Sequence, residues 1–243
     1  MVIKDGHFDT DEVRLHYIEG PASGPPLVFL HGGTGHCQAW NHLLPELTQR
    51  WHVYALDLRG HGQSGWGKGA EAYHVSRNGS DIAAFLREQV REKTVLVGHS
   101  WGGVIALVCA AQAKDYLRGL VLEDPPFGIR REGPELKPYL EYFGWILEIK
   151  KTTHTLDAMK AAILEANPNG MPAEYLESYA KRLLTVDPVF LAVTQAMAQV
   201  DGRCRSGVRG ARCGVPDSAA SGRSGDGRSI DSGGYQYCAG KRA

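Results

Sequence analysis

Residues 98–103 read Gly-His-Ser-Trp-Gly-Gly (GHSWGG) and stand between two segments of different character. The apolar run 94–97 before them is typical of a buried strand, and segment 104–113 after them is rich in small residues, as in a helix that packs closely on a sheet. A tight strand-to-helix turn needs glycine on both flanks of the serine, because a side chain there would clash with the sheet or the helix. We therefore expect the Ser100 hydroxyl to stand above the carboxyl edge of a sheet, facing the positive end of a helix dipole.

The segments around this turn alternate between strand and helix patterns. Short apolar runs at 25–30, 52–56, 94–97 and 117–122 predict buried strands, and residues 13–19 alternate in the period-2 pattern of a half-exposed strand. Ile82, Phe85 and Leu86 have helical spacing in one of the gaps. This alternation predicts an α/β fold with a mostly parallel sheet, right-handed crossovers and helices on both faces.

Residues 134–200 carry helical patterns without strand signals. Asp187-Pro188 predicts the start of the last helix, with an N-cap residue followed by proline at N1. We interpret the aromatic stripes of this region as core packing rather than as a binding surface. The apolar stripes comprise Tyr139, Leu140, Phe143 and Leu147, then Leu156, Met159 and Ile163, then Tyr175, Leu176, Tyr179 and Leu183.

The composition changes near Asp201. The 243-residue chain has a formal net charge of zero, but residues 201–243 carry a net charge of +4 and residues 1–200 a net charge of −4. The zero total removes any global electrostatic case for binding nucleic acid or an anionic membrane surface. The first residues, MVIKDGHFDTDEV, lack the apolar stretch of a signal peptide, and no apolar run is long enough to span a bilayer, so we expect a cytoplasmic protein. Cys37 and Cys109 are expected to be buried thiols, and the spacing of Cys204, Cys213 and Cys238 matches no zinc pattern.

Four motifs occur in one order along the chain: HGGTGH at 31–36, DLRGHGQS at 57–64, GHSWGG at 98–103 and EDPP at 123–126. With these motifs the chain resembles the α/β-hydrolase superfamily over about residues 10–200. The resemblance divides the chain into a hydrolase core (1–127), a helical cap (128–200) and an atypical tail (201–243) that we expect to be disordered or frameshifted. The C-terminal strands of the family are expected to be missing.

The resemblance also implies roles for individual residues. Ser100 would be the nucleophile, and the backbone N–H groups of Trp101 and Gly33 would form the oxyanion hole. Serine at position 100 argues against the aspartate chemistry of epoxide hydrolases and haloalkane dehalogenases. We expect hydrolysis of a small ester or related carbonyl substrate through an acyl-Ser100 intermediate, with no metal or organic cofactor. The sequence leaves the oligomeric state open.

Other polar residues of these motifs are interpreted as structural. His31, Arg59, His61 and His99 are expected to support the turns in which they stand, whereas His36 and Trp101 are candidates to line a pocket.

The general base is the unresolved part of this interpretation, because all ten histidines lie at or before position 154. A shifted reading frame or fusion scar from about residue 201 would explain the missing residues, and one possible codon choice for 217–223, read one base later, encodes an apolar strand ending in an acid. An unusual catalytic set would use Asp124 as the acid and His154 as the base. A catalytically inactive protein that binds a ligand or partner on the same scaffold is the third alternative.

Overall fold

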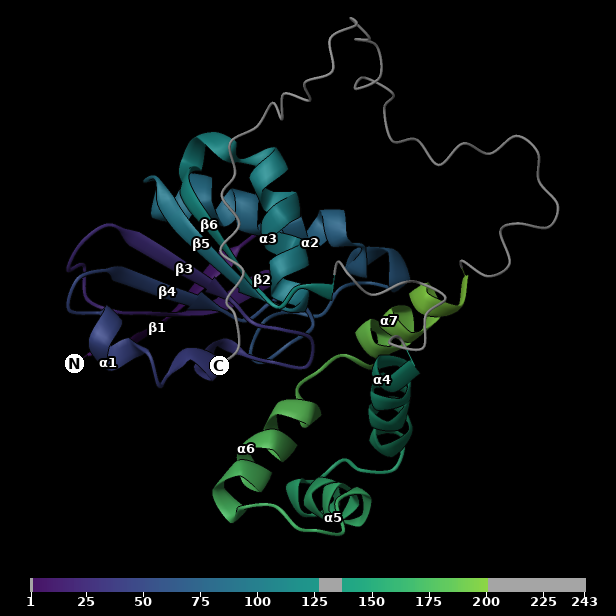
Figure 1. The fold of residues 1–243 in the computed structure, drawn as a ribbon. Coiled ribbons are helices and arrows are strands. Elements are labelled where there is room, and N and C mark those ends of the chain that lie inside the picture. Colours follow the sequence, from purple (N-terminus) through teal and green to yellow (C-terminus); the bar gives the residue numbers. More distant parts are fainter. Residues whose placement is uncertain (1, 127–136, 201–243) are drawn as a thin grey trace, which may run out of the picture. The chain divides into compact units, whose positions relative to one another are not determined.

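One sheet organises the fold in the computed structural model, which describes residues 2–126 and 137–200 (Figure 1). The tail 201–243 and the predicted start of the cap at 128–136 lie outside these residues. Within the described ranges the strand order is β1-β2-β4-β3-β5-β6. The strands are β1 (Lys4–Asp9), β2 (Arg14–Glu19), β3 (Pro26–Leu30), β4 (His52–Leu56), β5 (Thr94–His99) and β6 (Leu117–Glu123).

The four strands predicted as buried runs are parallel neighbours, as the alternating pattern indicated. Strand β3 pairs with β4 and β5, and β5 pairs with β6. Strand β2 joins β4 antiparallel, and β1 forms an antiparallel hairpin with β2. Strand β1 was not predicted, because its residues, KDGHFD, are mostly polar and mostly exposed. The sheet is therefore mostly parallel, with an antiparallel edge.

Helices cover both faces of the sheet, but to different extents. One face carries α2 (Val75–Ala84), its π-helical continuation η3 (Phe85–Val90) and α3 (Trp101–Gln112). On the other face, η1 (Cys37–Trp40) and α1 (Leu44–Leu47) pack over Phe29 and neighbouring strand residues. A fully buried side chain such as Phe85 contributes about 1.5–3 kcal/mol relative to an exposed one. Two short 3-10 turns, η2 (Ala70–Tyr73) and η4 (Lys114–Tyr116), complete this part.

Four helices after the sheet form the cap, and they have a hydrophobic core of their own. They are α4 (Lys137–Lys150), α5 (Leu156–Ala166), α6 (Ala173–Leu184) and α7 (Pro188–Val200). Met159, Ile163 and Leu183 from the predicted stripes are completely buried. Tyr139 and Tyr175 are corrections to the predicted core packing, because they are 43% and 54% exposed. Tyr175 lies near the start of α6, where its ring stacks on that of Tyr179.

The cap is joined to the core at the start of α7. Asp187 caps this helix, as predicted, by accepting a 2.8 Å hydrogen bond from the Val189 N–H. The Tyr73 hydroxyl donates to the other carboxylate oxygen of Asp187, and the Asp187 N–H donates to the Gly60 carbonyl at 2.8 Å. These bonds fix α7 against η2 and the loop after β4.

Two further expectations concern thiols and membranes. Cys37 and Cys109 are both free and buried, as expected. In the part of the chain that the structure describes, every helix is too short or too polar to cross a bilayer.

Candidate active site

Ser100 occupies a strained turn between β5 and α3. Its φ of 50° and ψ of −115° lie outside the regions that non-glycine residues favour. A Cβ on Gly98 would lie 2.3 Å from the Gly102 carbonyl oxygen, and one on Gly102 would lie 2.5 Å from the Leu30 and His31 carbonyl oxygens. Helix and strand backbones therefore approach each other so closely that both flanking positions require glycine. The expectation that a side chain here would clash with helix or sheet is confirmed.

The turn is fixed on both sides of the serine. The Ser100 N–H donates to the Glu123 carbonyl at 2.8 Å, which ties the turn to the end of β6. Helix α3 begins at Trp101, so its N-terminal amides and the positive end of its dipole lie beside Ser100. Ser100 itself is partly exposed. Ser100 is therefore a partly exposed residue at the amino end of α3.

The loop after β3 lies directly against this turn. A Cβ on Gly32 would lie 3.2 Å from the Ser100 Cβ. Thr34 has a φ of 63°, which is strained for a β-branched residue. Its N–H donates to His61 Nε2 at 3.3 Å, and its hydroxyl lies 3.0 Å from the Tyr142 hydroxyl on α4. These two bonds hold the loop in its strained conformation.

The Gly33 and Trp101 amides flank the serine and are available to a ligand. Among residues 2–126 and 137–200, no hydrogen bond from either N–H is present. Phe143 of α4 and Phe190 of α7 lie over Gly33, at 3.1 and 3.9 Å from where a glycine Cβ would stand. The two amides thus remain free donors beneath an aromatic cover.

Cap and core aromatic rings meet above the serine. Phe190 contacts Trp101 and His61, with ring centroids 6.2 and 4.5 Å apart, and it also packs against Tyr73 and Phe143. The sequence patterns indicated core packing for the aromatic stripes, and Phe143 shows that one of them also covers the site. Phe190 was not singled out, although its place three residues after the Asp187 N-cap could have directed attention to it.

His31 and His61 are structural, as expected. Burial lowers the pKa of His31 to about 3 and that of His61 to about 4, so both rings are neutral at pH 7. His31 accepts from the Leu58 N–H through Nε2 and donates to the Gly32 carbonyl through Nδ1. His61 accepts from Thr34 and donates to the Arg59 carbonyl. With both ring nitrogens engaged, neither histidine has a nitrogen free to act as a base.

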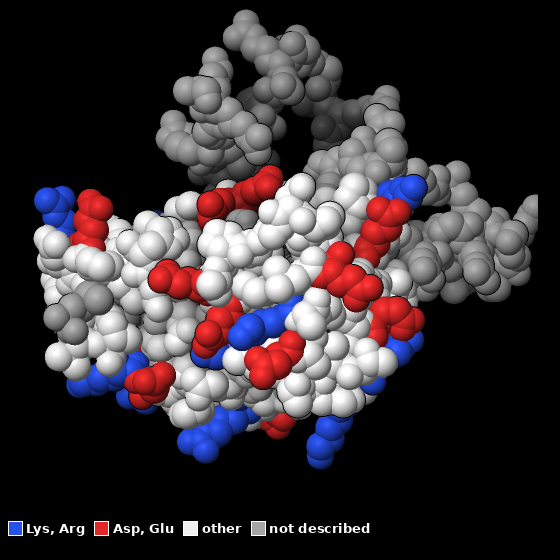
Figure 2. Space-filling model, turned by 90° about the horizontal axis from the view of Figure 1, so that it is seen from below, with Lys and Arg blue, Asp and Glu red and all other residues white. Residues whose placement is uncertain are grey.

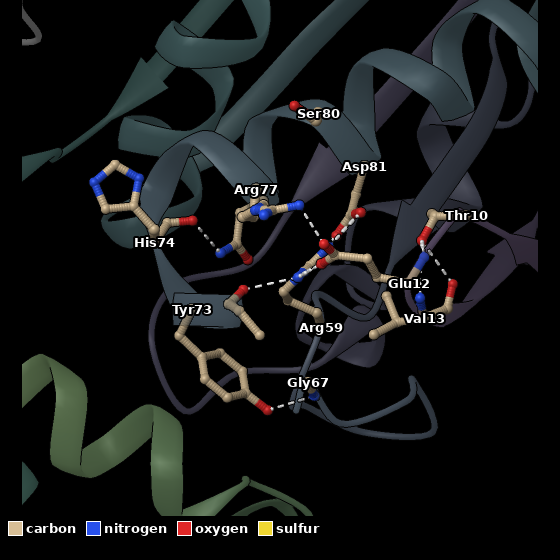
Figure 3. A network of polar contacts seen from close by, with 12 residues as sticks. Thr10, Glu12, Val13, Arg59, Gly67, Tyr73, His74, Arg77, Ser80 and Asp81 are labelled. Atoms are coloured by element: carbon tan, nitrogen blue, oxygen red, sulfur yellow. Dashed lines mark hydrogen bonds and ion pairs between the residues drawn. The ribbon is translucent and has the colours of Figure 1, made fainter. Parts of the chain in front are cut away.

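Arg59 anchors the DLRGHGQS loop in a polar network (Figure 3). Its buried guanidinium makes two 2.7 Å bonds to Asp81 of α2, one 2.8 Å bond to Glu12 and one 2.7 Å bond to the Ala72 carbonyl. Arg77 of α2 also pairs with Glu12. The turn-fixing role expected for Arg59 therefore extends to the β1–β2 connection and to η2.

The remaining candidates are Asp124, which follows β6, and His154, which precedes α5. Asp124 follows β6 directly, is exposed and has a strained φ of 46°. His154 is exposed just before α5. Within the described ranges, no hydrogen bond joins either side chain to Ser100 or to the other. Asp124 is thus near the serine turn along the sheet edge, and His154 has no partner there.

One buried group has the residue types of a metal site. His16, Cys37 and Asp57 place potential ligand atoms within 4.8 Å of one another. However, Asp57 already accepts hydrogen bonds from the Cys37 N–H at 2.6 Å, the Gln63 N–H at 2.9 Å and the His16 ring at 2.8 Å. Burial also raises the pKa of the Cys37 thiol well above its usual range. Hydrogen bonding therefore accounts for this cluster without a metal ion.

An apolar groove of about 450 Å³ lies apart from these residues. It runs between η2, α4 and α7, and its lining comprises Ala70, Leu147, Pro188, Val189, Ala192, Val193 and Ala196. None of the predicted catalytic residues contributes to it.

Comparison with known proteins agrees with this geometry. Residues 25–145 match the family model described as the alpha/beta hydrolase fold. The chain is 30% identical to epoxide hydrolase A of Mycobacterium tuberculosis over 167 residues, which cover 68% of this chain and 50% of that protein. It is 39% identical to lipase LipV of the same organism over 117 residues, which cover 46% and 42% of the two chains. The chain thus spans about half the length, or less, of these relatives.

A solved structure supports the same conclusion about the fold. An epoxide hydrolase from Bacillus megaterium superimposes with a TM-score of 0.64 at 23% sequence identity, covering 79% of this chain and 71% of that one. The serine turn, the loop beside it and the helical cap therefore stand on a scaffold that these hydrolases share. The chain belongs to the α/β-hydrolase fold family.

Proposed function

We propose that the protein is a serine hydrolase that cleaves a small ester or related carbonyl substrate through an acyl-Ser100 intermediate. The observation that carries the proposal is the strained turn at Ser100, with two free amides beside it. Strain of this kind costs about 1–3 kcal/mol and persists where the surrounding structure enforces it, often at functional sites. A serine at this turn supports acyl chemistry of the kind named for lipase LipV, one of the relatives of this chain.

In the proposed reaction, Ser100 Oγ attacks the substrate carbonyl carbon while a general base takes the hydroxyl proton, and the carbonyl oxygen becomes an oxyanion. The N–H groups of Gly33 and Trp101 donate to that oxygen, and each donor of this type is typically worth about 10²–10³ in rate. The base gives that proton to the leaving group, which departs when the tetrahedral intermediate collapses to the acyl-enzyme. Water then attacks the acyl-enzyme with the same base taking its proton, which releases the acid and restores Ser100. Asp124, at the end of β6, is our candidate for the carboxylate that orients a base.

A ligand-binding protein without catalytic activity is the second candidate. It is favoured by one observation: in the described part of the chain, no histidine makes a hydrogen bond to Ser100. Without a base to take its proton, the Ser100 hydroxyl is a weak nucleophile near neutral pH. The oxyanion hole and the cap would then bind a carbonyl compound without turning it over.

A fluorophosphonate probe separates the two candidates. Stoichiometric labelling of the folded protein that disappears in Ser100→Ala supports the hydrolase, whereas folded protein that does not label contradicts it. The variant His154→Ala tests the unusual base, because unchanged labelling and turnover in that variant would exclude it. Ser80→Ala, which alters an exposed serine on α2, controls for non-specific labelling.

A further inference from the structure

Three hydroxyl groups form a line across the junction between core and cap. The Thr34 hydroxyl lies 3.0 Å from that of Tyr142, and the Tyr179 hydroxyl of α6 donates to Tyr142 at 3.2 Å. Three hydroxyls carry three hydrogens, and two of them are used in the two bonds. Within the described residues no other acceptor contacts this line. One O–H donor is therefore left for a ligand, whichever way the bonds to Tyr142 run.

Arg182 lies at the α6 end of this line. Its guanidinium carbon is 4.9 Å from the centroid of the Tyr179 ring, and its Nε is buried without a hydrogen-bond partner. No carboxylate in residues 2–126 or 137–200 pairs with it. Arg59, by contrast, satisfies its donors with Asp81, Glu12 and a carbonyl. Because buried polar groups almost always have partners, the unpaired Nε of this partly buried side chain indicates a missing acceptor.

His36 adds a third donor from the core side. Its Nδ1 accepts the Gln38 N–H at 3.1 Å, so the proton of the neutral ring is on Nε2. Burial lowers the pKa of His36, and the nearby positive charge of Arg182 lowers it further, which keeps the ring neutral. No acceptor for this Nε2 proton is present among the described residues. The charge of Arg182 thus acts on the His36 ring, and neither group has an acceptor among the described residues.

We propose that Arg182, with the Tyr142 and Tyr179 hydroxyls and His36, forms a subsite for a carboxylate group of the substrate. A carboxylate is planar and can accept two parallel hydrogen bonds from a guanidinium, and its single charge matches one arginine. Thr34 connects the line to Gly33, its neighbour in the proposed oxyanion hole. A substrate would then place its reactive carbonyl at Gly33 and Trp101 and a separate, free carboxylate at Arg182. This inference rests on the proposed function, because it names the class of acyl compound that the same site selects.

Binding is measured directly, so that the result does not depend on turnover. Isothermal titration calorimetry of full-length Ser100→Ala protein with glutarate, a dicarboxylate, is compared with titration of its neutral analogue glutaramide. We expect glutarate to bind and the neutral amide to bind at least 10-fold more weakly. Adding Arg182→Gln should weaken glutarate binding by about 10- to 100-fold, because charged hydrogen bonds are lost. Adding Tyr179→Phe, which keeps the ring beneath Arg182, should weaken it less.

The matched control is Lys181→Gln. Lys181 precedes Arg182 on α6 but is exposed and paired with Glu177 at 2.6 Å, so its loss removes the same charge without touching the subsite. Equal glutarate affinity in the Arg182→Gln and Lys181→Gln proteins, with matching melting curves, would overturn the inference, as would absence of glutarate binding. If the probe labels Ser100 but glutarate does not bind, the subsite fails and the hydrolase proposal stands. If Ser100 does not label but glutarate binding depends on Arg182, the hydrolase proposal fails and the subsite stands.

Discussion

The Arg59–Asp81 ion pair offers a quantitative test of how the fold holds its functional loop. The Arg59 side chain is 2% exposed and that of Asp81 is 6% exposed, and two 2.7 Å bonds join them. Replacing Asp81 with asparagine keeps the shape but leaves a buried guanidinium without its main counterion. Removing one partner of a buried pair costs about 3–5 kcal/mol. Because Glu12 and the Ala72 carbonyl still contact Arg59, we expect a value near the lower end, about 3 kcal/mol.

The matched comparison is Glu12→Gln. The Glu12 side chain is 35% exposed, so its bond to Arg59 is solvated and should be worth only about 0.5–1 kcal/mol. Urea denaturation of both variants, with linear extrapolation to water, gives the two losses. For a domain of about 200 residues, a loss near 3 kcal/mol should lower the melting temperature by about 6–12 °C. Figure 3 shows why the two acids should differ, since Asp81 projects from α2 toward Arg59 while Glu12 is shared with Arg77.

The double variant Arg59→Met/Asp81→Leu completes the test. Replacing both charges with apolar side chains removes the cost of a lone buried charge, so it should be more stable than Asp81→Asn alone. If Asp81→Asn loses no more stability than Glu12→Gln, the pair does not anchor the loop and the reasoning from burial is wrong.

Three further predictions follow from features of the site and cap. Gly98→Ala should destabilise by about 3 kcal/mol or more in thermal melts, because its Cβ would meet backbone at 2.3 Å. Gly119→Ala, whose Cβ would make only an ordinary 3.6 Å contact with the Val95 side chain, should change stability by less than about 1 kcal/mol, and equal losses would refute this. His31 and His61 have pKa values of about 3 and 4, below the ordinary 6.5. Between pH 6.5 and 4, therefore, the two rings bind protons in the unfolded chain but remain neutral in the folded protein. Stability should therefore fall as the pH is lowered from 6.5 to 4, by up to about 1.4 kcal/mol per pH unit for each ring, and a flat urea midpoint over that range would contradict it. Tyr73→Phe should cost about 1–3 kcal/mol and speed amide hydrogen exchange in α7, because the carboxylate at the helix start loses a donor; unchanged exchange would refute that role.

The surface charge of the described residues is mixed, in line with the near balance of charges in the sequence. Figure 2 shows acidic and basic side chains interspersed on the face seen there, with no patch of one sign dominating it.

Much of the core was predictable because its signals are local. Buried parallel strands appear in the sequence as continuous apolar runs. The glycines around Ser100 mark a strand-to-helix turn so tight that larger side chains would clash at the flanking positions. Asp187-Pro188 likewise marks the start of α7 through its own cap. Strand β1 was not predicted because an exposed edge strand needs no apolar pattern, and Lys4–Asp9 has almost none.

The contacts of the site were not predictable, because they join residues that no local pattern connects. Thr34 meets Tyr142, 108 positions away, and the strained φ of Thr34 has no signature in its own residue type. The sequence also does not indicate that Arg182 lacks a partner, because Lys181 and Arg182 are both basic residues in the last turn of α6. Only the packed cap shows that Lys181 has a carboxylate and Arg182 has none among the described residues.

The hydrogen bonds that join the cap to the core also limit the order in which the parts of the chain can fold. Tyr73 and Asp187 are 114 positions apart, so their contact cannot form before nearly all of the cap has been synthesised. Closing a loop of that length is entropically unfavourable until other contacts compensate, and contacts of this range slow folding. The sheet and α3 can therefore assemble while the cap is still absent, leaving Ser100 and the Gly33 loop uncovered in a nascent chain. Completion of α7 is thus the step that brings Phe190 over Gly33 and against Trp101.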